Sequence, residues 1–400
     1  MVNNKKIVIV SAVFPPEPVV SAQISYDLAK ELSNNFPVVV LCPAPTRPNG
    51  RKFPKMDFFN ESFSRIVLNS YTHPQSDFIG RMRESWDFGK LTARYIDENH
   101  EEIGCVYMNT WPIWGQYLAL NALTKYKIPS IVHIQDIYPE SMLPRLGILG
   151  NLIDMPLRLL DRIELTKASF CFAISENMKK YMSFSRNISL SKIEVIRNWQ
   201  DDSLFVKNDQ REKCNKFTFM FVGSISPAAG VLFLIQSFIC ADLNNARLVI
   251  AGDGSDKQKC IDFAKKYPEK DISFCNVSPQ TVPLVQKEAD VLLLSLRKGL
   301  GVTASPSKLP AYMFSAKPVL ASVDHDTDVE YVIRESKGGW VCPAGDKDEL
   351  ICKMKYVMSL PKETLIEKGL SAQQYALSHF TRDINLKKMI EKIKLIYRND

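Results

Sequence analysis

The sequence predicts an α/β protein built from two doubly wound, parallel-sheet domains. The chain has 400 residues, more than one ordinary hydrophobic core accommodates. Short β-branched runs alternate with segments of helical periodicity in both halves, a pattern that favours parallel sheets covered by helices. Between the halves, residues 195–216 are polar, charged and aperiodic, which indicates a linker.

The first half begins with a continuous apolar run at 5–12, as expected for a buried parallel strand. A loop and a helical segment, Ser21–Leu32, follow, and Phe36–Pro43 predicts a second strand. The runs 105–109 and 129–136 predict later strands of the same sheet. This pattern predicts a first domain over 1–200.

In the second half the pattern starts again. Five apolar runs, each followed by a helical segment, lie at 217–224, 246–254, 272–277, 289–296 and 317–324. From 362 onward the chain is almost wholly helical. We therefore expect a second domain over 201–380 and a terminal helix over 381–400. Two such halves are expected to face one another across a cleft, with ligands at the carboxyl ends of the strands.

The composition fits a globular enzyme, with 46% hydrophobic and 24% charged residues. The net charge of +7 is spread along the chain, which argues against a nucleic-acid-binding arm. Nine cysteines stand singly, so they indicate reduced intracellular thiols rather than zinc ligands or disulfides. The N-terminal apolar run is too short for a signal peptide. The uncharged stretches 105–124 and 217–241 are interpreted as strand, turn and helix rather than membrane spans.

One predicted helix of the second half begins with a lysine, Lys308, that has no carboxylate nearby in the sequence. Ser307 is a suitable N-cap for a helix over 308–316, and Pro310 falls in its first turn. Ser307 and Lys308 are then expected at a helix N-terminus at the carboxyl edge of the sheet, where an anion is favoured. The hypothesis is a phosphate site; the alternative is a solvated surface lysine.

Two glycine turns follow strands in the same half. Gly223 and Ser224 follow the first run, and Gly252, Asp253 and Gly254 follow the second. Neither turn is a dinucleotide fingerprint or a P-loop. With Lys308 they indicate a nucleoside diphosphate site. Two further cations, Arg297 and Lys298, follow the fourth run and are predicted to contribute to it.

The first half offers two candidate sites. The segment 132–141 leaves a strand with His133, Asp136 and Glu140, and we expect His133 and Asp136 to face the cleft; a core histidine is the alternative. A rigid loop after the first strand carries Pro16 and Glu17, with Glu17 expected to point toward the cleft, although a simple turn would explain it equally well.

An acidic segment, 324–328, contains an Asp-x-Asp pair of the kind that holds a divalent cation in some sugar transferases. Here it precedes a predicted helix, and capping by an aspartate is the preferred interpretation. We therefore expect no metal site.

Two segments mix large apolar residues with isolated arginines. They are 77–90, with Phe78, Arg81, Met82 and Arg83, and Leu143–Ile163. This composition is suited to docking on an anionic membrane surface, and an ordinary amphipathic core helix is the alternative.

These segments together resemble a known family. The chain is similar to the retaining nucleotide-sugar glycosyltransferases of family 4, which have the GT-B fold, and especially to the bacterial subgroup for capsule, O-antigen and exopolysaccharide synthesis that includes N-acetyl-L-fucosamine transferases. The matching segments, in family order, are 14–32, 133–141, 192–202, 222–225, 251–254, 288–296, 306–313 and 317–324.

The resemblance implies roles for several residues. Gly223, Gly252, Gly254, Ser307 and Lys308 would surround the diphosphate, His133 would touch the donor sugar, and the loop at 15–17 would lie toward the acceptor. The last helix would cross back onto the first domain. The resemblance also implies a metal-independent reaction with front-face attack by the acceptor hydroxyl.

The chain departs from the family pattern at several positions. Thr303 and Ala311 stand where many members have two glutamates, for the sugar and the ribose, and Ser224 and Ala229 replace basic residues. Val19-Val20-Ser21 replaces a glycine-rich acceptor loop. Recognition of the diphosphate is therefore expected to depend on Lys308, Arg297 and Lys298.

The expected function is transfer of a sugar, such as an N-acetylated amino or deoxy sugar, from a nucleoside diphosphate to a lipid-linked glycan. UDP is expected rather than GDP, no further cofactor is expected, and the expected location is the cytoplasm, at the inner face of the bacterial inner membrane. Two alternatives remain. One is a nucleotide-sugar epimerase of the same fold. The other is a non-catalytic nucleotide-sugar-binding protein, which the missing glutamates favour.

Overall fold

The computed structural model describes residues 5–47, 53, 61–73, 77–109, 113–141, 147–199, 202–205, 215–278, 280–299 and 308–398. By compactness the chain divides into two units. Unit 1 comprises Met1–Asn198 with Asn385–Asp400, and unit 2 comprises Trp199–Ile384. Each unit contains one parallel sheet, which confirms the predicted pair of parallel-sheet α/β domains.

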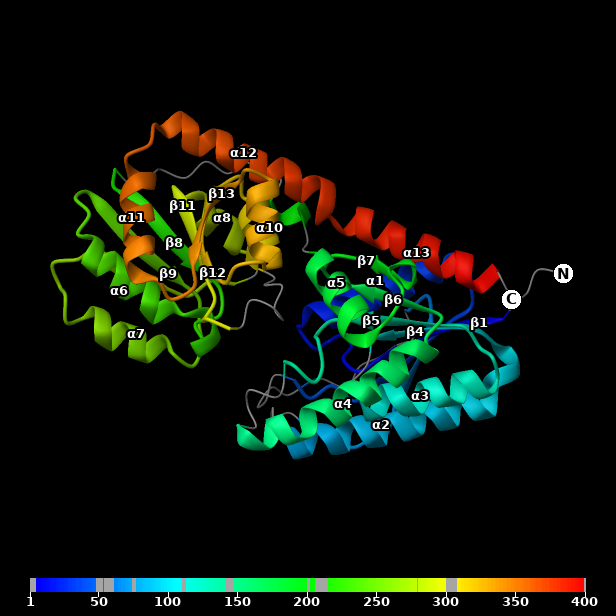
Figure 1. Cartoon of the computed structure of the whole chain (residues 1–400). Helices are drawn as coiled ribbons and strands as arrows, with labels where there is room; N and C mark the ends of the chain where they lie inside the picture. The colour runs from blue at the N-terminus through cyan, green and yellow to red at the C-terminus, as the bar shows by residue number, and fades with distance from the viewer. Residues whose placement is uncertain are drawn as a thin grey trace. The chain divides into compact units, whose positions relative to one another are not determined.

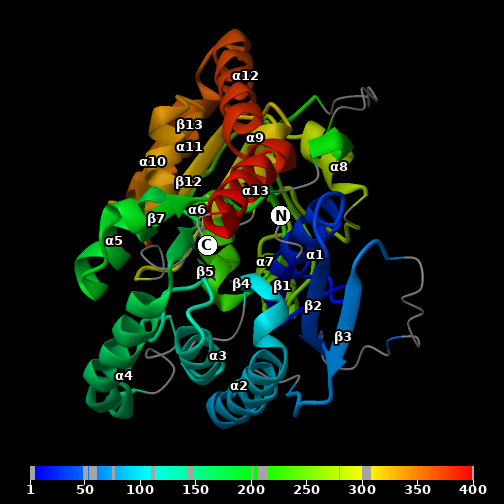
Figure 2. The ribbon, with the colours of Figure 1, turned by 90° about the vertical axis from the view of Figure 1, so that its right-hand side faces the viewer.

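The sheet of unit 1 has the order β3-β2-β1-β4-β5-β6-β7, and Figure 2 shows β3, β2 and β1 side by side at one edge. Its strands are β1 (Lys6–Ser11), β2 (Val38–Pro43), β3 (Ser64–Leu68), β4 (Ile103–Asn109), β5 (Ser130–Ile134), β6 (Phe170–Ala173) and β7 (Ile193–Val195). β1 and β2 pair in parallel with Ile7 opposite Val38. β1 and β2 are buried along nearly their whole length, which explains their unbroken apolar sequences.

Helices cover both faces of this sheet, with α2, α3 and α4 on one side and α1 and α13 on the other (Figure 1). Their bounds are α1 (Val20–Leu32), α2 (Phe78–Asn99), α3 (Trp114–Lys125), α4 (Ile148–Lys167), α5 (Glu176–Arg186) and α13 (Arg382–Arg398). One core joins α2, α3, α4 and α5 to the strands through residues such as Phe88, Leu120, Leu165 and Met182. The C-terminal helix α13 is fastened to the first strand, because Tyr397 Oη donates a hydrogen bond to Lys5 O at 2.9 Å.

Unit 2 repeats the plan with the order β10-β9-β8-β11-β12-β13. The strands are β8 (Phe217–Val222), β9 (Ala246–Ala251), β10 (Ile272–Cys275), β11 (Val291–Ser295), β12 (Val319–Val323) and β13 (Gly339–Pro343). The helices are α6 (Val231–Ala241), α7 (Lys257–Ala264), α8 (Val282–Lys287), α9 (Lys308–Phe314), α10 (Asp328–Glu335), α11 (Lys347–Met358) and α12 (Lys362–His379). One core packs α6, α7 and α11 on one face, and a second packs α8, α9, α10 and α12 on the other.

In each sheet, successive strands are added first toward one edge and then, after one reversal, toward the other edge. In unit 1 the reversal lies between β1 and β4, and in unit 2 between β8 and β11. The carboxyl ends of the strands beside such a reversal leave a crevice for a ligand. The candidate sites of both units lie at these strand ends.

Candidate functional sites

Unit 1 has a pocket of about 110 Å³ at the carboxyl ends of β1, β4 and β5. Residues from these strand ends and from α1, α3, α4 and α5 line it: Ala12, Val13, Ser21, Asn109, Gln116, His133, Ile134, Gln135, Asp136, Tyr138, Asp161, Leu165 and Met182. Asn109 links the first helix to this edge, because its Nδ2 donates to Ser21 O and Ser25 Oγ, both at 3.0 Å. His133 and Asp136, both predicted site residues, therefore line one pocket.

His133 is held in the pocket wall by aromatic neighbours. Tyr107 Oη lies 2.6 Å from Nδ1 of the imidazole, and the Phe172 ring packs edge-on at a centroid distance of 5.7 Å. His133 is only 4% exposed, and burial lowers the pKa of its imidazole to about 3. The ring is therefore neutral at physiological pH. Nε2 is buried and has no hydrogen-bond partner within the described part of the chain.

Gln135 and Asp136 follow His133 on the same strand end. Gln135 Oε1 accepts a hydrogen bond from Asn198 Nδ2 at 2.9 Å. Gln135 Nε2 is buried without a partner among the described residues. Asp136 is exposed. The pocket wall thus contains two buried nitrogens available to a ligand and an exposed carboxylate.

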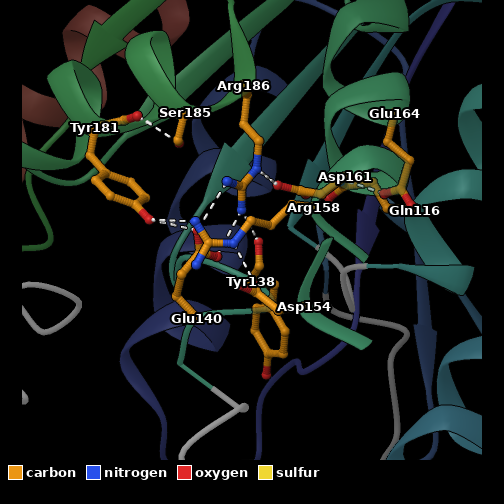
Figure 3. A network of polar contacts seen from close by, with 10 residues as sticks. All are labelled: Gln116, Tyr138, Glu140, Asp154, Arg158, Asp161, Glu164, Tyr181, Ser185 and Arg186. Atoms are coloured by element: carbon orange, nitrogen blue, oxygen red, sulfur yellow. Dashed lines mark hydrogen bonds and ion pairs between the residues drawn. The ribbon is translucent and has the colours of Figure 1, made fainter. Parts of the chain in front are cut away.

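A buried arginine fixes the turn after β5, as Figure 3 shows. Arg186 on α5 is fully buried and donates to both carboxylate oxygens of Glu140, at 3.0 and 2.7 Å. It also donates to Asp161 Oδ2 at 2.6 Å and to Tyr138 O. Although burial opposes it, hydrogen bonds from Arg186 and Tyr181 lower the pKa of Glu140. Glu140, noted in the sequence beside the site residues, therefore anchors the turn.

Two more buried carboxyls lie on α4, beside the same pocket (Figure 3). Burial raises the pKa of Asp161 to about 6, although Arg186 opposes the shift. Burial, with the charge of Asp161 one turn away, raises the pKa of Glu164 well above its usual range. Gln116 Nε2 donates to Glu164 Oε2 at 3.2 Å. Asp161, Glu164 and Arg186 were not predicted as site residues, because isolated charged residues in a helical pattern resemble an ordinary solvated face.

The loop after β1 differs from its predicted orientation. Glu17 is 4% exposed, and its Oε1 accepts backbone hydrogen bonds from Thr46 and Arg47 at 2.9 and 2.8 Å. Glu17, expected to point toward the cleft, thus ties this loop to the segment after β2. Pro16 follows a cis peptide bond in the same loop.

In unit 2 the two glycine turns pack against each other. Gly223, Gly252 and Gly254 have φ angles of +139°, +145° and +155°, which glycine adopts readily. Ile225 N donates to Asp253 O at 2.8 Å. A β-carbon on Gly252 would lie 2.0 Å from Gly223 O. Only glycine at this position allows the two turns to approach each other so closely. Asp253 accepts from the backbone N of Gly254 at 2.9 Å.

Lys308, the first residue of α9, reaches back over this pair of turns. Its Nζ donates to Ser224 O at 3.2 Å and lies 4.4 Å from the centre of the Phe221 ring. Burial lowers the pKa of Lys308 to about 8. No carboxylate within the described ranges forms an ion pair with it. The structure therefore brings the Lys308 side chain against Gly223 and Ser224. Its amine keeps its positive charge at neutral pH.

The remaining predicted cations are placed differently. Arg297 and Lys298 follow β11 and are exposed, and neither side chain has a hydrogen bond or ion pair to another described residue. The backbone N of Arg297 donates to Ala228 O at 2.9 Å. Ser307 and Thr303 lie outside the described residues, so the predicted N-cap of α9 is untested. Ala311 lies within α9.

The acidic segment 324–328 caps a helix, but the capping residue is not an aspartate. Thr327 is the N-cap of α10 and accepts from Glu330 N at 3.3 Å, while Glu330 Oε2 accepts from Asp326 N at 2.9 Å. This reciprocal arrangement satisfies two backbone donors that a single aspartate would leave partly unmet. In the part of the chain that the structure describes, no group of three or more His, Cys, Asp or Glu side chains is arranged to hold a metal ion.

One face of α4 carries exposed apolar side chains. Leu152, Met155, Leu159 and Ile163 are 71%, 82%, 56% and 41% exposed, at a spacing that puts them on one side of the helix. We call these four residues the α4 stripe. On α2, Phe78 and Met82 are half-buried, and Arg81 forms an ion pair with buried Glu84 at 3.0 Å. Ile79 and Trp86 are the exposed apolar residues there, with Arg83 over the Tyr71 ring.

Residues 143–146, part of the predicted membrane segment, lie outside the described residues. None of the helices in the described ranges is long and apolar enough to cross a bilayer.

Comparison with known proteins gives a family match to unit 2. Residues 216–359 match the family model described as glycosyl transferases group 1. A relative named Probable glycosyltransferase WbjE, from Pseudomonas aeruginosa, is 23% identical over 265 residues, or 62% of this chain. The chain spans 64% of the length of that relative.

Solved structures share the whole fold. A glycosyltransferase from Rickettsia africae ESF-5 has a TM-score of 0.71 at 17% identity, with 100% of each chain covered. Anabaena Alr3699/HepE, solved in complex with UDP, has a TM-score of 0.68 at 16% identity, covering 97% of this chain and 99% of that one. At such low sequence identities, the likeness shows that these proteins share a fold with this chain and nothing more specific. Residues 216–359 therefore match the group 1 glycosyl transferase family model, and the chain as a whole has the two-domain, GT-B-like fold of these structures.

Proposed function

We propose that the chain is a retaining glycosyltransferase that moves a sugar from UDP to a lipid-linked glycan acceptor during synthesis of a surface polysaccharide. The sugar we propose is an N-acetylated amino or deoxy sugar. We propose 1–200 as the acceptor-side domain, 201–380 as the donor-binding domain and 381–400 as the terminal helix. The observation that carries the proposal is Lys308, a half-buried cation without a carboxylate partner among the described residues.

Even a half-buried cation without a counter-ion carries a desolvation cost, which a ligand can offset by supplying negative charge. Lys308 lies at the carboxyl ends of parallel strands, over turns where Gly223 and Gly252 bring the backbone close together. A diphosphate is the ligand chemistry that such a position favours. The family match covers residues 216–359 of this unit, and a protein of similar fold was solved in complex with UDP.

The same residues suit the chemistry of transfer. When the bond between the sugar and the diphosphate breaks, negative charge grows on the leaving phosphate oxygen. A cation already held at that position stabilises the transition state more than the bound donor. We assign this role to Lys308, with Ser307, Arg297 and Lys298 as further donor-side residues and Gly223, Ser224, Gly252, Asp253 and Gly254 as the turns that admit the diphosphate.

We assign the handling of the sugar and the acceptor to unit 1. His133 and Asp136 line its pocket, and the neutral imidazole of His133 suits hydrogen bonding to a sugar. The loop containing Pro16 and Glu17 is proposed to lie on the acceptor side, with Glu17 acting through the backbone that it holds.

A titration of UDP against matched lysine variants tests the donor site. Lys308→Ala should weaken binding by roughly 1.5–3 kcal/mol, the scale of a charge-assisted hydrogen bond. Lys368→Ala is the control, because Lys368 also lies over an aromatic ring, at 5.2 Å from Trp340, and donates to a backbone carbonyl at 3.3 Å. Equal affinities of wild type and Lys308→Ala for UDP would show that the donor site is assigned wrongly. GDP is titrated in parallel to test the choice of base.

Release of UDP from candidate UDP-sugars, with and without a lipid-linked acceptor, separates the three functional hypotheses. A transferase releases UDP in step with glycosylation of the acceptor. An epimerase alters the donor without an acceptor, and a non-catalytic binding protein does neither. Comparing the anomeric configuration of donor and product by NMR then tests retention.

The reaction is proposed to need no metal, because a protein cation takes the position that a metal would occupy beside the diphosphate. Transfer should continue in EDTA, and Asp326→Ala should leave donor binding unchanged. Loss of transfer in EDTA, with recovery on addition of manganese or magnesium, would contradict this.

A lipid-linked acceptor requires access to a membrane surface. The α4 stripe provides four exposed apolar side chains, and Arg162 is exposed on the same helix. Apolar residues beside cations are suited to the interface of an anionic bilayer. We propose that unit 1 binds the membrane through the α4 stripe, with Ile79, Arg83 and Trp86 of α2 contributing.

Sedimentation with vesicles tests this surface. Binding to anionic vesicles should exceed binding to neutral ones and fall as salt rises. Replacing Leu152, Met155 and Leu159 with serine should abolish it. Replacing Ile366, Leu370 and Leu377, which are 50%, 54% and 47% exposed on α12, is the matched control. Equal binding by the two triple variants would contradict the assignment.

A further inference from the structure

The contact between Tyr107 and His133 determines which imidazole nitrogen carries the proton. Both side chains are buried, and Tyr107 Oη lies 2.6 Å from Nδ1. Burial raises the pKa of Tyr107 well above its usual range and lowers that of His133 to about 3. At neutral pH the pair therefore consists of a phenol and a neutral imidazole, which has one N–H and one acceptor nitrogen.

Two arrangements of protons are open to this pair, and they differ in the number of polar groups left unpaired. If Tyr107 donates to Nδ1, the proton of the ring is on Nε2, and Nε2–H is the only unpaired group. If Nδ1–H donates to the phenol oxygen, the Tyr107 hydroxyl proton and the Nε2 lone pair both lack partners, because neither has one among the described residues. An unpaired buried polar group is costly, so the first arrangement is favoured.

We propose that Tyr107 is a positioning residue that fixes His133 as the Nε2–H tautomer, so that the pocket of unit 1 presents a neutral N–H donor to its ligand. The ligand atom at this position must then be an acceptor, such as a hydroxyl, ring or carbonyl oxygen. Gln135 Nε2, the other buried nitrogen without a described partner in this wall, adds a second donor. The pocket therefore selects an uncharged, oxygen-rich group, which deepens and rests on the proposed sugar transfer.

The tautomer can be measured without any substrate. Long-range ¹H–¹⁵N correlation spectra of full-length protein labelled at its five histidines distinguish protonated from unprotonated ring nitrogens. His133→Gln identifies the signals of His133. We expect a protonated Nε2 and an unprotonated Nδ1 in the wild type. A protonated Nδ1 would overturn the proposal, whatever the enzyme does.

Tyr107→Phe removes the donor to Nδ1 with little change in shape. Both tautomers then leave the same number of unpaired groups, so the Nδ1–H form should become populated. Phe172→Leu, which alters the packing of the same ring without a hydrogen bond, should keep the wild-type tautomer. A single Nε2–H tautomer in Tyr107→Phe would show that Tyr107 does not set it.

A kinetic measurement connects the tautomer to the ligand. In Tyr107→Phe, kcat/KM for the sugar donor should fall in proportion to the lost fraction of the Nε2–H form, while affinity for UDP alone stays the same. An unchanged kcat/KM alongside a mixed tautomer would overturn the role assigned to Nε2–H. If the wild type transfers no sugar, the proposed function fails, and the spectra still decide the tautomer.

Discussion

The Cε atom of Lys308 lies 2.4 Å from the position that a β-carbon on Gly223 would occupy. Gly223 also has a φ angle of +139°, which residues with a β-carbon rarely adopt. Glycine at this position therefore permits the turn after β8 and leaves space for the lysine side chain. The two residues form one structural feature, although 85 positions separate them in the sequence.

Gly223→Ala should disturb both the backbone of this turn and the position of the Lys308 side chain. The added methyl group would strain the turn, at a cost of about 1–3 kcal/mol in unfolding free energy, and would displace Lys308. UDP affinity, measured by calorimetry, should fall as well. The control is Gly345→Ala, because Gly345 has a φ of +75° but no atom within 4 Å of the added carbon. The control should lose stability and keep its UDP affinity; equal affinity losses in both variants would refute the link to Lys308.

UDP binding should weaken at alkaline pH, because Lys308 loses its positive charge. The pKa of this amine is about 8, so it is charged below pH 8 and neutral above it in the free protein. The dissociation constant for UDP should therefore rise by up to about tenfold per pH unit above 8, until the pKa in the complex is passed. Titrations between pH 7.5 and pH 9.5 measure this slope.

Lys308→Arg provides the control for this slope. The guanidinium stays charged over the same range, so the variant should bind UDP more weakly at pH 7.5, because its geometry differs, and show no slope. A wild-type affinity that is constant from pH 7.5 to pH 9.5 would contradict pairing of Lys308 with the diphosphate.

His133 should make the protein less stable in acid. The pKa of its imidazole is about 3 in the folded state and near 6.5 when exposed, so between these values the unfolded chain binds more protons. The contribution of His133 to the free energy of unfolding is fully present above pH 6.5. It falls by about 1.4 kcal/mol per pH unit below that value. Wild type should therefore lose about 2 kcal/mol more than His133→Gln between pH 6.5 and pH 5 in urea unfolding.

Comparing the two proteins isolates His133, because Asp161 acts in the opposite direction in both. The pKa of Asp161 is raised to about 6, so its contribution to stability increases as the pH falls below 6. Parallel pH profiles for wild type and His133→Gln would mean that the imidazole is protonated in the folded protein.

Arg186 should be far more important to stability than Arg158, although both contact Glu140. The Arg186 side chain is fully buried, whereas Arg158 is 37% exposed and lies 3.4 Å from the carboxylate. Arg186→Met removes the buried cation that pairs with both Glu140 and Asp161 and should cost about 3–5 kcal/mol. Arg158→Met should cost less than about 1 kcal/mol. Similar losses in thermal or urea unfolding would contradict the assigned role of Arg186 in holding the turn after β5.

The long buried strands were predictable from the sequence because burial on both faces produces an unbroken apolar run. β1, β2, β8 and β11 all follow this rule. β7 was not predicted, because three residues are too few to show a pattern. β3 was not predicted either, since it is an edge strand with exposed and half-buried side chains.

Individual site residues were less predictable than the strands. Lys308 was identified because a cation at the start of an apolar helix has no structural reason of its own. Glu17 was expected to point toward the cleft, and in the structure its carboxylate accepts two backbone hydrogen bonds from residues 29 and 30 positions along the chain. Sequence reasoning does not show which distant backbone donors a carboxylate will find.

The sequence by itself determined the two wound sheets and the strand ends where a ligand can bind, because hydrophobic periodicity and glycine turns are local properties of the chain. Only the tertiary structure decided the protonation of His133 and the pairing of Arg186. Both depend on burial and on partners that are remote in sequence, since Tyr107 lies 26 positions from His133 and Asp161 lies 25 positions from Arg186. A pKa reflects the whole environment of a group, and that environment exists only once the chain has folded.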